Sequence, residues 1–260
     1  MSDCVSDERQ LRRRMDVKKH IDYYSIAPTY ASHRKPVLLA LRELEQRVGL
    51  SDRSKVLEVG CGTGAHISSL VNATKCLGMG IDPSPRMLRH SASPRGVELC
   101  VGSAEKLPLN EDFFDLVFSV DVIHHLKDTQ AYFREAFRVL RPRGAICTVT
   151  DSEEIIKSRN PFTVYWPGTV QVDLARYPPI PLLREQMTSV GFAEIEESQI
   201  ETPYQIVDST PYRKKAYSCL HLISEREFQE GLRRLEQDLR KGPVPGLMRY
   251  VCVWGRRRQA

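Results

Sequence analysis

The chain has 260 residues, of which 41% are hydrophobic and 27% are charged. This length allows one large α/β domain or two small ones, and the composition excludes disordered and fibrous classes. No apolar stretch approaches the ~20 residues that span a bilayer, and the polar first residues lack the apolar segment of a secretory signal. We therefore expect a cytoplasmic protein without a membrane span.

The formal net charge of +5 raises the question of an anionic partner such as nucleic acid. Residues 1–20 hold six Lys/Arg and four acids, and residues 249–260 hold four Arg and no acid. Without the +2 and +4 of these two ends, residues 21–248 carry −1. We expect frayed, solvated ends and no basic face for nucleic acid.

The seven cysteines are an odd number, and no two have the CxxC spacing of a metal or redox pair. Several lie in apolar runs such as VELCV and YVCVW, where cysteine acts as a small buried hydrophobe. We expect reduced, structural cysteines and predict no metal site.

Along the chain, apolar runs bounded by turn residues alternate with segments of helical period, which indicates repeated βα units. A helix over residues 38–48 ends at Gly49, and a second one with Phe133 and Phe137 on its apolar face ends before RPRG. The strands expected in this part are residues 55–59, 76–81, 97–101, 114–120 and 145–150.

After Thr150 the pattern changes. Residues 157–181 hold five prolines among four aromatic residues, which is too proline-rich for a long regular element and suits a wall or lid over a pocket. Further helices are expected over residues 182–190 and 224–239, and further strands over residues 192–200 and 250–254.

The sharpest local signal is VLEVGCGTGAHI, in which a predicted strand leads into Gly60, Gly62 and Gly64 and then a helix. Glycines there allow a tight turn and let backbone N–H groups approach a polar ligand. The same loop also fits a dinucleotide fingerprint, with Asp82 at the position of a ribose-binding carboxylate. The loop alone therefore leaves the type of nucleotide open.

Four runs follow one another in order: EVGCGTG, GIDPSPRML, VGSAEKLPLNEDFFDLVFSVDVIHHL and FREAFRVLRPRG. This succession resembles class I S-adenosylmethionine (SAM)-dependent methyltransferases, especially the group that includes the menaquinone/ubiquinone-biosynthesis C-methyltransferases. The resemblance implies an α/β fold, a Rossmann-like three-layer sandwich with a seven-stranded, mostly parallel sheet, an antiparallel last strand and a small helical cap. It implies an N-terminal helical cap segment over residues 1–50 and a methyltransferase domain over residues 51–260, with cap contributions from residues 155–181 and 204–240.

The resemblance also implies SAM as the cofactor and S-adenosylhomocysteine (SAH) as its product. Asp82 is expected to bind the ribose hydroxyls, and Met87 to pack near the adenine. The family commonly has Asp where this chain has Ser103, so weaker adenine binding is expected. The implied cofactor contacts are Tyr24, Tyr30, Glu58, Gly60, Cys61, Gly62, Gly64, Asp82, Pro83, Met87, Ser103, Ala104 and Val120.

Methyl transfer is an in-line displacement, which needs aligned reactants and a base only where the acceptor is protonated. His124 and His125 are the candidate catalytic residues because they follow a strand at the edge where open α/β sheets bind ligands. We favour structural support for the pair, and we expect His125 to be the more buried of the two.

We predict methyl transfer to a small-molecule acceptor. Two alternatives stay open: an RNA methyltransferase, since VIHHL also occurs in wobble-uridine tRNA enzymes, and a SAM-binding protein without turnover. The near-neutral middle of the chain argues against nucleic acid. The candidate substrate contacts, which are equally ordinary core aromatics, are Tyr165, Trp166, Tyr177 and Tyr212.

Overall fold

Seven strands form one sheet in the order β3-β2-β1-β4-β5-β7-β6 in the computed structural model, which describes residues 36–89 and 96–259. All neighbouring pairs are parallel except those that β7 makes with β5 and β6. The predicted seven-stranded, mostly parallel sheet with an antiparallel last strand is confirmed. The strands are β1 (Lys55–Val59), β2 (Leu77–Asp82), β3 (Val97–Val101), β4 (Phe114–Val120), β5 (Leu140–Thr150), β6 (Phe192–Ile206) and β7 (Val244–Arg257).

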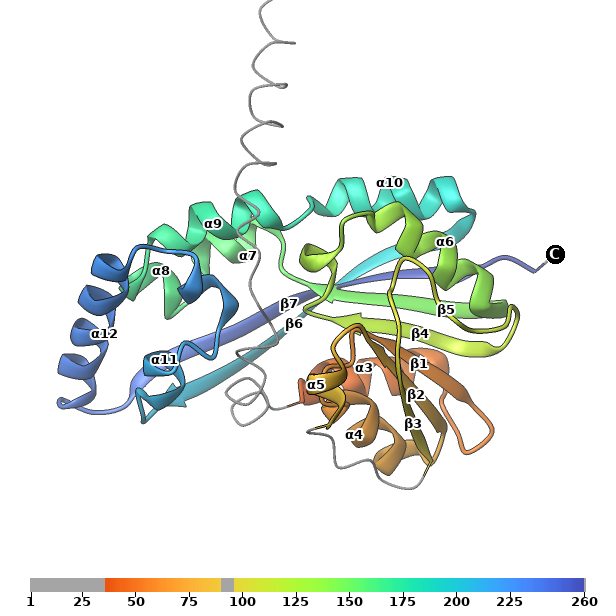
Figure 1. Ribbon diagram of the computed structural model, residues 1–260, viewed down its shortest axis with the longest axis horizontal. Helices are drawn as coiled ribbons and strands as arrows, with labels where there is room; N and C mark the ends of the chain where they lie inside the picture. The colour runs from red at the N-terminus through yellow and green to blue at the C-terminus, as the bar shows by residue number, and fades with distance from the viewer. Residues whose placement is uncertain (1–35, 90–95, 260) are drawn as a thin grey trace, which may run out of the picture.

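Helices cover both faces of this sheet, as Figure 1 shows. One layer holds α3 (Leu38–Val48) and α4 (Ala65–Thr74), and the other holds α6 (Thr129–Val139) and α10 (Ile180–Val190). Because both faces are covered, every residue of β4 is buried, as expected for the centre of a parallel sheet.

The helix α3 belongs to the sheet's own layers. Its residues Ala40 and Leu44 have no exposed surface and join the core cluster that also contains Ile67 of α4 and Phe118 of β4. The C-terminal part of the expected N-terminal cap segment is therefore a helix of the central sandwich. Residues 1–35 of that segment lie outside the described residues.

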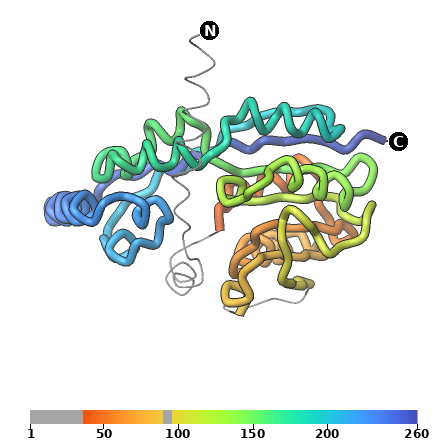
Figure 2. Tube along the Cα trace, turned by 45° about the horizontal axis from the view of Figure 1, so that its top comes forward, coloured from red at the N-terminus to blue at the C-terminus, as the bar shows by residue number. Residues whose placement is uncertain are grey.

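The strands β6 and β7 continue past the rest of the sheet as a long antiparallel ribbon, paired as far as Ile206 and Val244. Helices gather along this ribbon up to its far end and form the group that we call the cap, which Figures 1 and 2 show beside the sandwich. These elements are α7 (Glu153–Ser158), α8 (Phe162–Tyr165), α9 (Gly168–Arg176), α11 (Thr210–Arg213), the 3₁₀ turn η2 (Ser218–His221) and α12 (Glu225–Leu239).

The cap has an apolar core of its own, separate from the two clusters that flank the sheet. Trp166 lies at its centre, stacked on Tyr212 with ring centroids 5.4 Å apart. The helix α12 closes this core with Phe228 and Leu235, which lie on its one apolar face.

The C-terminal arginines correct one expectation. Arg249, Arg256 and Arg257 lie in β7 and not in a frayed end. Each is held by side-chain contacts, for example Arg256 with Glu194 and Arg257 with Asp112. The strand is longer than its apolar residues indicated because arginine stems can pack along a sheet while their charged heads find partners.

Among the residues described, no helix is both long and apolar enough to cross a bilayer. The six cysteines in this part of the chain are free thiols, and five of them are buried.

Candidate functional site

A cavity of ≈ 420 Å³ opens at the carboxyl ends of β1, β2 and β4. This is the edge at which open α/β sheets bind ligands. Of the predicted cofactor contacts, those that line the cavity are Gly60, Cys61, Gly62, Asp82, Pro83, Met87, Ser103, Ala104 and Val120.

The glycine loop between β1 and α4 forms one side of the cavity. Gly60, Gly62 and Gly64 have φ angles of 71°, 56° and 73°, in the left-handed region that glycine adopts at least cost. A Cβ atom at Gly60 would lie 2.4 Å from a methyl carbon of Val122, so a side chain does not fit there. The loop thus brings its backbone close to the space that a ligand would occupy.

Asp82 ends β2 with its carboxylate in the wall of the cavity. One oxygen accepts the Gly62 N–H at 2.8 Å, and the other accepts the Ser84 N–H at 2.8 Å. Burial raises the pKa of Asp82, although both hydrogen bonds favour the charged form. A carboxylate has about four acceptor sites, so each oxygen can still accept a hydroxyl from a ligand.

Glu58 and Gly64 lie beneath the cavity and are not among the described residues that line it. Glu58 is 1% exposed, and its Oε2 accepts the Ile67 N–H at 2.9 Å. Its Oε1 is 3.2 Å from His66 Nδ1. Glu58 therefore holds the first turn of α4 in place.

Apolar side chains and a hydroxyl also line the cavity. Met87 and Ala104 are almost fully buried, and Leu126 lies beside them in the lining. Ser103 Oγ accepts the Glu105 N–H at 3.2 Å. The predicted contacts Tyr24 and Tyr30 lie outside the described residues.

The two neighbouring histidines have different environments. His124 is 8% exposed, whereas His125 is exposed and lines the cavity. The expectation that His125 is the more buried is therefore wrong. Both lie in the 3₁₀ turn η1 (Ile123–His125), where about three residues per turn point successive side chains in different directions.

The four predicted substrate contacts are buried and are not among the described lining residues. Tyr165, Trp166 and Tyr212 belong to the core of the cap. Trp166 Nε1 donates to the Phe228 carbonyl at 3.0 Å. Tyr177 packs on His124. Neither of these two residues lines the cavity, which the next residue, His125, does.

Two carboxylates at this edge were not predicted from the sequence. Asp121 follows β4 and lines the cavity, and its Oδ2 accepts the hydroxyl proton of Tyr250 at 2.9 Å. Asp151 follows β5 and is 3% exposed. Both directly follow a predicted parallel strand, so the rule that singled out Asp82 could also have found them.

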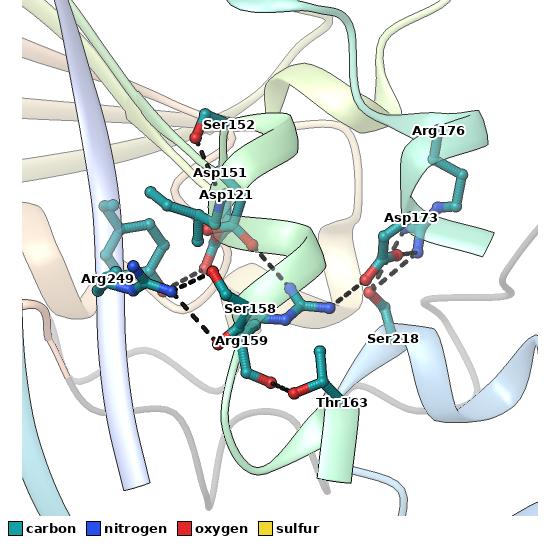
Figure 3. A network of polar contacts seen from close by, with 12 residues as sticks. Asp121, Asp151, Ser152, Ser158, Arg159, Thr163, Asp173, Arg176, Ser218 and Arg249 are labelled. Carbon is teal, nitrogen blue, oxygen red and sulfur yellow. Dashed lines mark hydrogen bonds and ion pairs between the residues drawn. The ribbon is translucent and has the colours of Figure 1, made fainter. Parts of the chain in front are cut away.

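Asp151 begins a chain of buried charges that connects the sheet with the cap, as Figure 3 shows. Arg159 Nη1 is 2.7 Å from Asp151 Oδ2, and Arg159 Nη2 contacts Asp173 of α9. Arg176 then pairs with Asp173 at 3.0 Å. Burial raises the pKa of Asp151 to about 7, against the opposing effect of Arg159.

Comparison with known proteins matches residues 57–148 to a methyltransferase domain family. The chain is 32% identical over 154 residues to a tRNA U34 carboxymethyltransferase of Saccharophagus degradans, which covers 53% of this chain and 44% of that protein. The chain therefore spans less than half the length of that relative.

Solved structures show the same fold. A putative methyltransferase from an antibiotic biosynthesis pathway of Anabaena variabilis has a TM-score of 0.67 at 21% identity and covers 85% of this chain and 98% of its own. Phosphoethanolamine N-methyltransferase 2 of Haemonchus contortus, solved with SAM, has a TM-score of 0.60 at 18% identity and covers 95% and 60%.

Residues 57–148 therefore match a methyltransferase domain, and the described chain has the fold of solved methyltransferases. The glycine loop, Asp82 and both histidines lie inside this matched part, whereas the four aromatic candidates lie outside it. The narrower assignment to the menaquinone/ubiquinone group stays a prediction.

Proposed function

We propose that the chain transfers the methyl group of SAM to a small-molecule acceptor. The observation that carries the proposal is the cavity at the end of the methyltransferase domain's strands, which both Asp82 and Met87 line. The chemistry of this lining fits SAM, because a carboxylate can accept ribose hydroxyls and apolar side chains can cover a purine ring.

The cofactor supplies a methyl group on a positively charged sulfur, and the protein's task is to bind, align and exclude water. Asp82 accepts the ribose hydroxyls, and the glycine loop lets its backbone N–H groups approach the ligand. Met87 and Ala104 cover the adenine. Of the two histidines, His125 lines the cavity, and it is our candidate for taking a proton from an acceptor.

The environment of the C-terminal arginines supports a small acceptor over RNA. A phosphate backbone is bound by solvated Lys and Arg side chains that release counterions. Here Arg257 is bound to backbone carbonyls of α6 and β5, and Arg256 to the Arg47 carbonyl. Most of the positive charge at the C-terminal end is therefore engaged in holding β7.

A tRNA methyltransferase is the second candidate, which the similarity to the Saccharophagus protein favours. This candidate predicts tRNA binding that weakens steeply with salt. The slope of log binding constant against log salt concentration is then proportional to the number of phosphates contacted. A filter-binding titration of bulk tRNA between about 50 and 200 mM salt distinguishes the two acceptor classes. Salt-insensitive or absent tRNA binding supports the small molecule.

The proposal is tested by calorimetric titration of SAH into the wild type, Asp82→Ala, Asp82→Asn and Asp52→Ala. Asp52 is exposed in a loop away from the cavity and serves as the matched control. We expect the wild type and Asp52→Ala to bind equally, and Asp82→Ala to lose about tenfold or more, since two charge-assisted hydrogen bonds are removed. No binding of SAH by the folded wild type would overturn the proposal.

Turnover separates an enzyme from a binding protein. Release of SAH from labelled SAM with a panel of small amines, phenols and thiols is expected for the enzyme. The free, buried cysteines suit the reducing cytosol that we propose as its compartment.

A further inference from the structure

Asp121 is a second carboxylate of the cavity, besides Asp82, that stands at the end of a strand. It follows β4, lines the cavity and is half-buried. Its Oδ2 accepts the hydroxyl proton of Tyr250 at 2.9 Å, and its backbone N–H donates to the Val149 carbonyl at 3.0 Å. Contacts with β7 and β5 thus fix the residue at the edge where open α/β sheets bind ligands.

The backbone of Asp121 has a conformation that residues other than glycine rarely adopt. Its φ angle is 57°, and among the described non-glycine residues that line the cavity it alone lies in the left-handed region. Such a conformation costs free energy, persists where surrounding contacts impose it, and is often found at functional sites. The contacts with Tyr250 and Val149 impose it here. The fold therefore holds a carboxylate at the cavity in spite of this cost.

The charged side chains that line the cavity are mostly acids. Among the described residues they are Asp82, Glu105, Asp121 and Lys127, and three acids with one lysine give a formal charge of −2 when the lining histidines are neutral. Asp82 is assigned to the ribose under the proposed function. Glu105 Oε1 accepts the N–H groups of Lys127 and Asp128 at 2.7 and 2.9 Å, so it holds the turn before α6. Asp121 is the lining carboxylate that neither task includes.

The negative charge of this lining exceeds the positive charge of the cofactor. A SAM molecule has a net charge of +1, because its sulfonium and ammonium groups outnumber its one carboxylate. The arginines of the connection to the cap in Figure 3, Arg159 and Arg176, are bound to Asp151 and Asp173 and are not among the described lining residues. A cavity lined by one sign of charge attracts the opposite sign, so the lining favours a second ligand that is a cation.

We propose that Asp121 binds the acceptor and selects an aliphatic amine, which enters the cavity as an ammonium ion. This inference rests on the proposed function and names its substrate class. Asp121 contacts the acceptor and determines its specificity, since an ionised carboxylate accepts hydrogen bonds from an ammonium group. Tyr250 is a positioning residue because it acts through Asp121.

The amine loses a proton before it reacts. The ammonium group held by Asp121 gives one proton to the imidazole of His125, which lines the cavity and is exposed, so the proton can pass on to solvent. The nitrogen lone pair then forms the bond to the methyl carbon as the carbon–sulfur bond breaks, and that bonding pair stays on the sulfur. The products are SAH and a methylated ammonium ion.

The test uses acceptor probes that share one carbon skeleton and differ in one functional group. Each set holds a primary amine and the corresponding alcohol, thiol and carboxylic acid, on a propyl, a 2-phenylethyl or a 2-(indol-3-yl)ethyl skeleton. Release of SAH from SAM is measured for the wild type, Asp121→Asn and Tyr250→Phe. The matched control is Asp115→Asn, because Asp115 is a buried carboxylate of the same strand that accepts the Lys55 N–H and lies outside the described lining.

We expect the wild type to turn over amines in preference to the other members of each set. Asp121→Asn should raise KM for the amine about tenfold or more, since a charge-assisted contact is removed, while calorimetry should show an unchanged affinity for SAH. Tyr250→Phe should raise the same KM by less and also leave the affinity for SAH unchanged. Asp115→Asn should keep the wild-type KM, whatever stability it loses.

A measurement on the wild type alone keeps the test independent of how well the variants fold. Each amine should raise the Tm of the SAH-loaded protein more than the alcohol of the same set does. Equal effects of amine and alcohol would count against the proposal. Thermal unfolding of Asp121→Asn and Tyr250→Phe in the presence of SAH shows that they are folded before their KM values are compared.

Three results would overturn the amine assignment while leaving the proposed function standing. They are turnover of alcohols, thiols or acids at least equal to that of amines, no turnover of any amine by a wild type that binds SAH, and an unchanged amine KM in Asp121→Asn. A loss of SAH affinity in Asp121→Asn as large as the change in KM would place Asp121 at the cofactor and also overturn the inference. Failure of the wild type to bind SAH would instead overturn the proposed function itself.

Discussion

The imidazole ring of His124 stacks on the phenol ring of Tyr177, with centroids 4.0 Å apart and planes inclined by 17°. His124 follows β4, and Tyr177 follows α9. The stack therefore joins the ligand-binding edge of the sheet to the cap. It also assigns different environments to two histidines that are adjacent in the sequence.

We expect His124→Ala to destabilise the protein and His125→Ala to leave its stability unchanged. An aromatic pair contributes about 0.5–1.5 kcal/mol beyond the area that it buries, and truncation adds a void behind the cavity. His125 is exposed, and substitutions at such positions usually change stability by less than about 0.5 kcal/mol. Chemical denaturation followed by circular dichroism measures both variants.

The catalytic expectation for His125 is tested with the same protein samples. If His125→Ala is folded and binds SAH but has lost turnover, a role in proton transfer is supported. Full turnover in this variant would restrict the pair to structural support, and a loss of stability in His125→Ala comparable to that of His124→Ala would contradict the assignment of environments.

Arg159 is predicted to be the most sensitive charged residue of the connection in Figure 3. Its side chain is 17% exposed and bridges Asp151 and Asp173. Arg159→Leu leaves two buried carboxylates without their shared cation, which typically costs about 3–5 kcal/mol. Differential scanning calorimetry should show a correspondingly large fall in Tm.

The matched control is Arg184→Leu. Arg184 also pairs with a carboxylate, that of Glu197, but both side chains are substantially exposed. Exposed pairs contribute about 0–1 kcal/mol, so this variant should unfold close to the wild type. Similar losses in the two variants would mean that burial does not set the strength of the Arg159 bridges.

The sandwich could be predicted from the sequence because its signals are local. The glycines between β1 and α4 have left-handed φ angles, and Asp82 ends β2 where the apolar run of that strand ends. The buried strand β4 is mostly apolar, with only Asp115 and Ser119 as polar residues, and short-range patterning reveals it.

The rest depends on contacts between distant residues. Nothing local distinguishes His124 from His125, because Tyr177 decides which one is covered. In the sequence, Arg257 is only a charged residue near the end of the chain. Its contacts with α6 and Asp112 depend on the fold. The Pro-rich segment contains Trp166 as an apparent pocket aromatic, yet its indole fills the cap core against α12.

Gly231 of α12 allows this close approach of the helix to Trp166. A Cβ atom there would lie 2.3 Å from Trp166 Nε1 and 2.3 Å from the Tyr165 carbonyl oxygen. Replacing glycine by alanine inside a helix normally stabilises by about 1 kcal/mol. Here we expect Gly231→Ala to destabilise instead, because overpacking of about 1–3 kcal/mol outweighs that gain.

Trp fluorescence during urea unfolding measures this change, since Trp166 reports on the cap core. Arg233→Ala is the control, because Arg233 is exposed on the same helix. A stabilised Gly231→Ala would show that α12 can shift away from Trp166 without loss of packing.

Arg257 tests whether the basic C-terminal end serves the fold. Its guanidinium lies 2.9 Å from the Phe137 carbonyl in the last turn of α6 and pairs with Asp112. Carbonyls at a helix C-terminus lack intrahelical partners, so arginine there supplies donors that the fold needs. Arg257→Ala should therefore lower stability by about 1–3 kcal/mol, whereas Arg258→Ala, at an exposed neighbour, should not.

If the end instead binds a phosphate backbone, Arg258→Ala should weaken tRNA binding and reduce its salt dependence by about one counterion. Unfolding midpoints and salt titrations on this pair of variants thus separate a structural arginine cluster from a nucleic-acid contact.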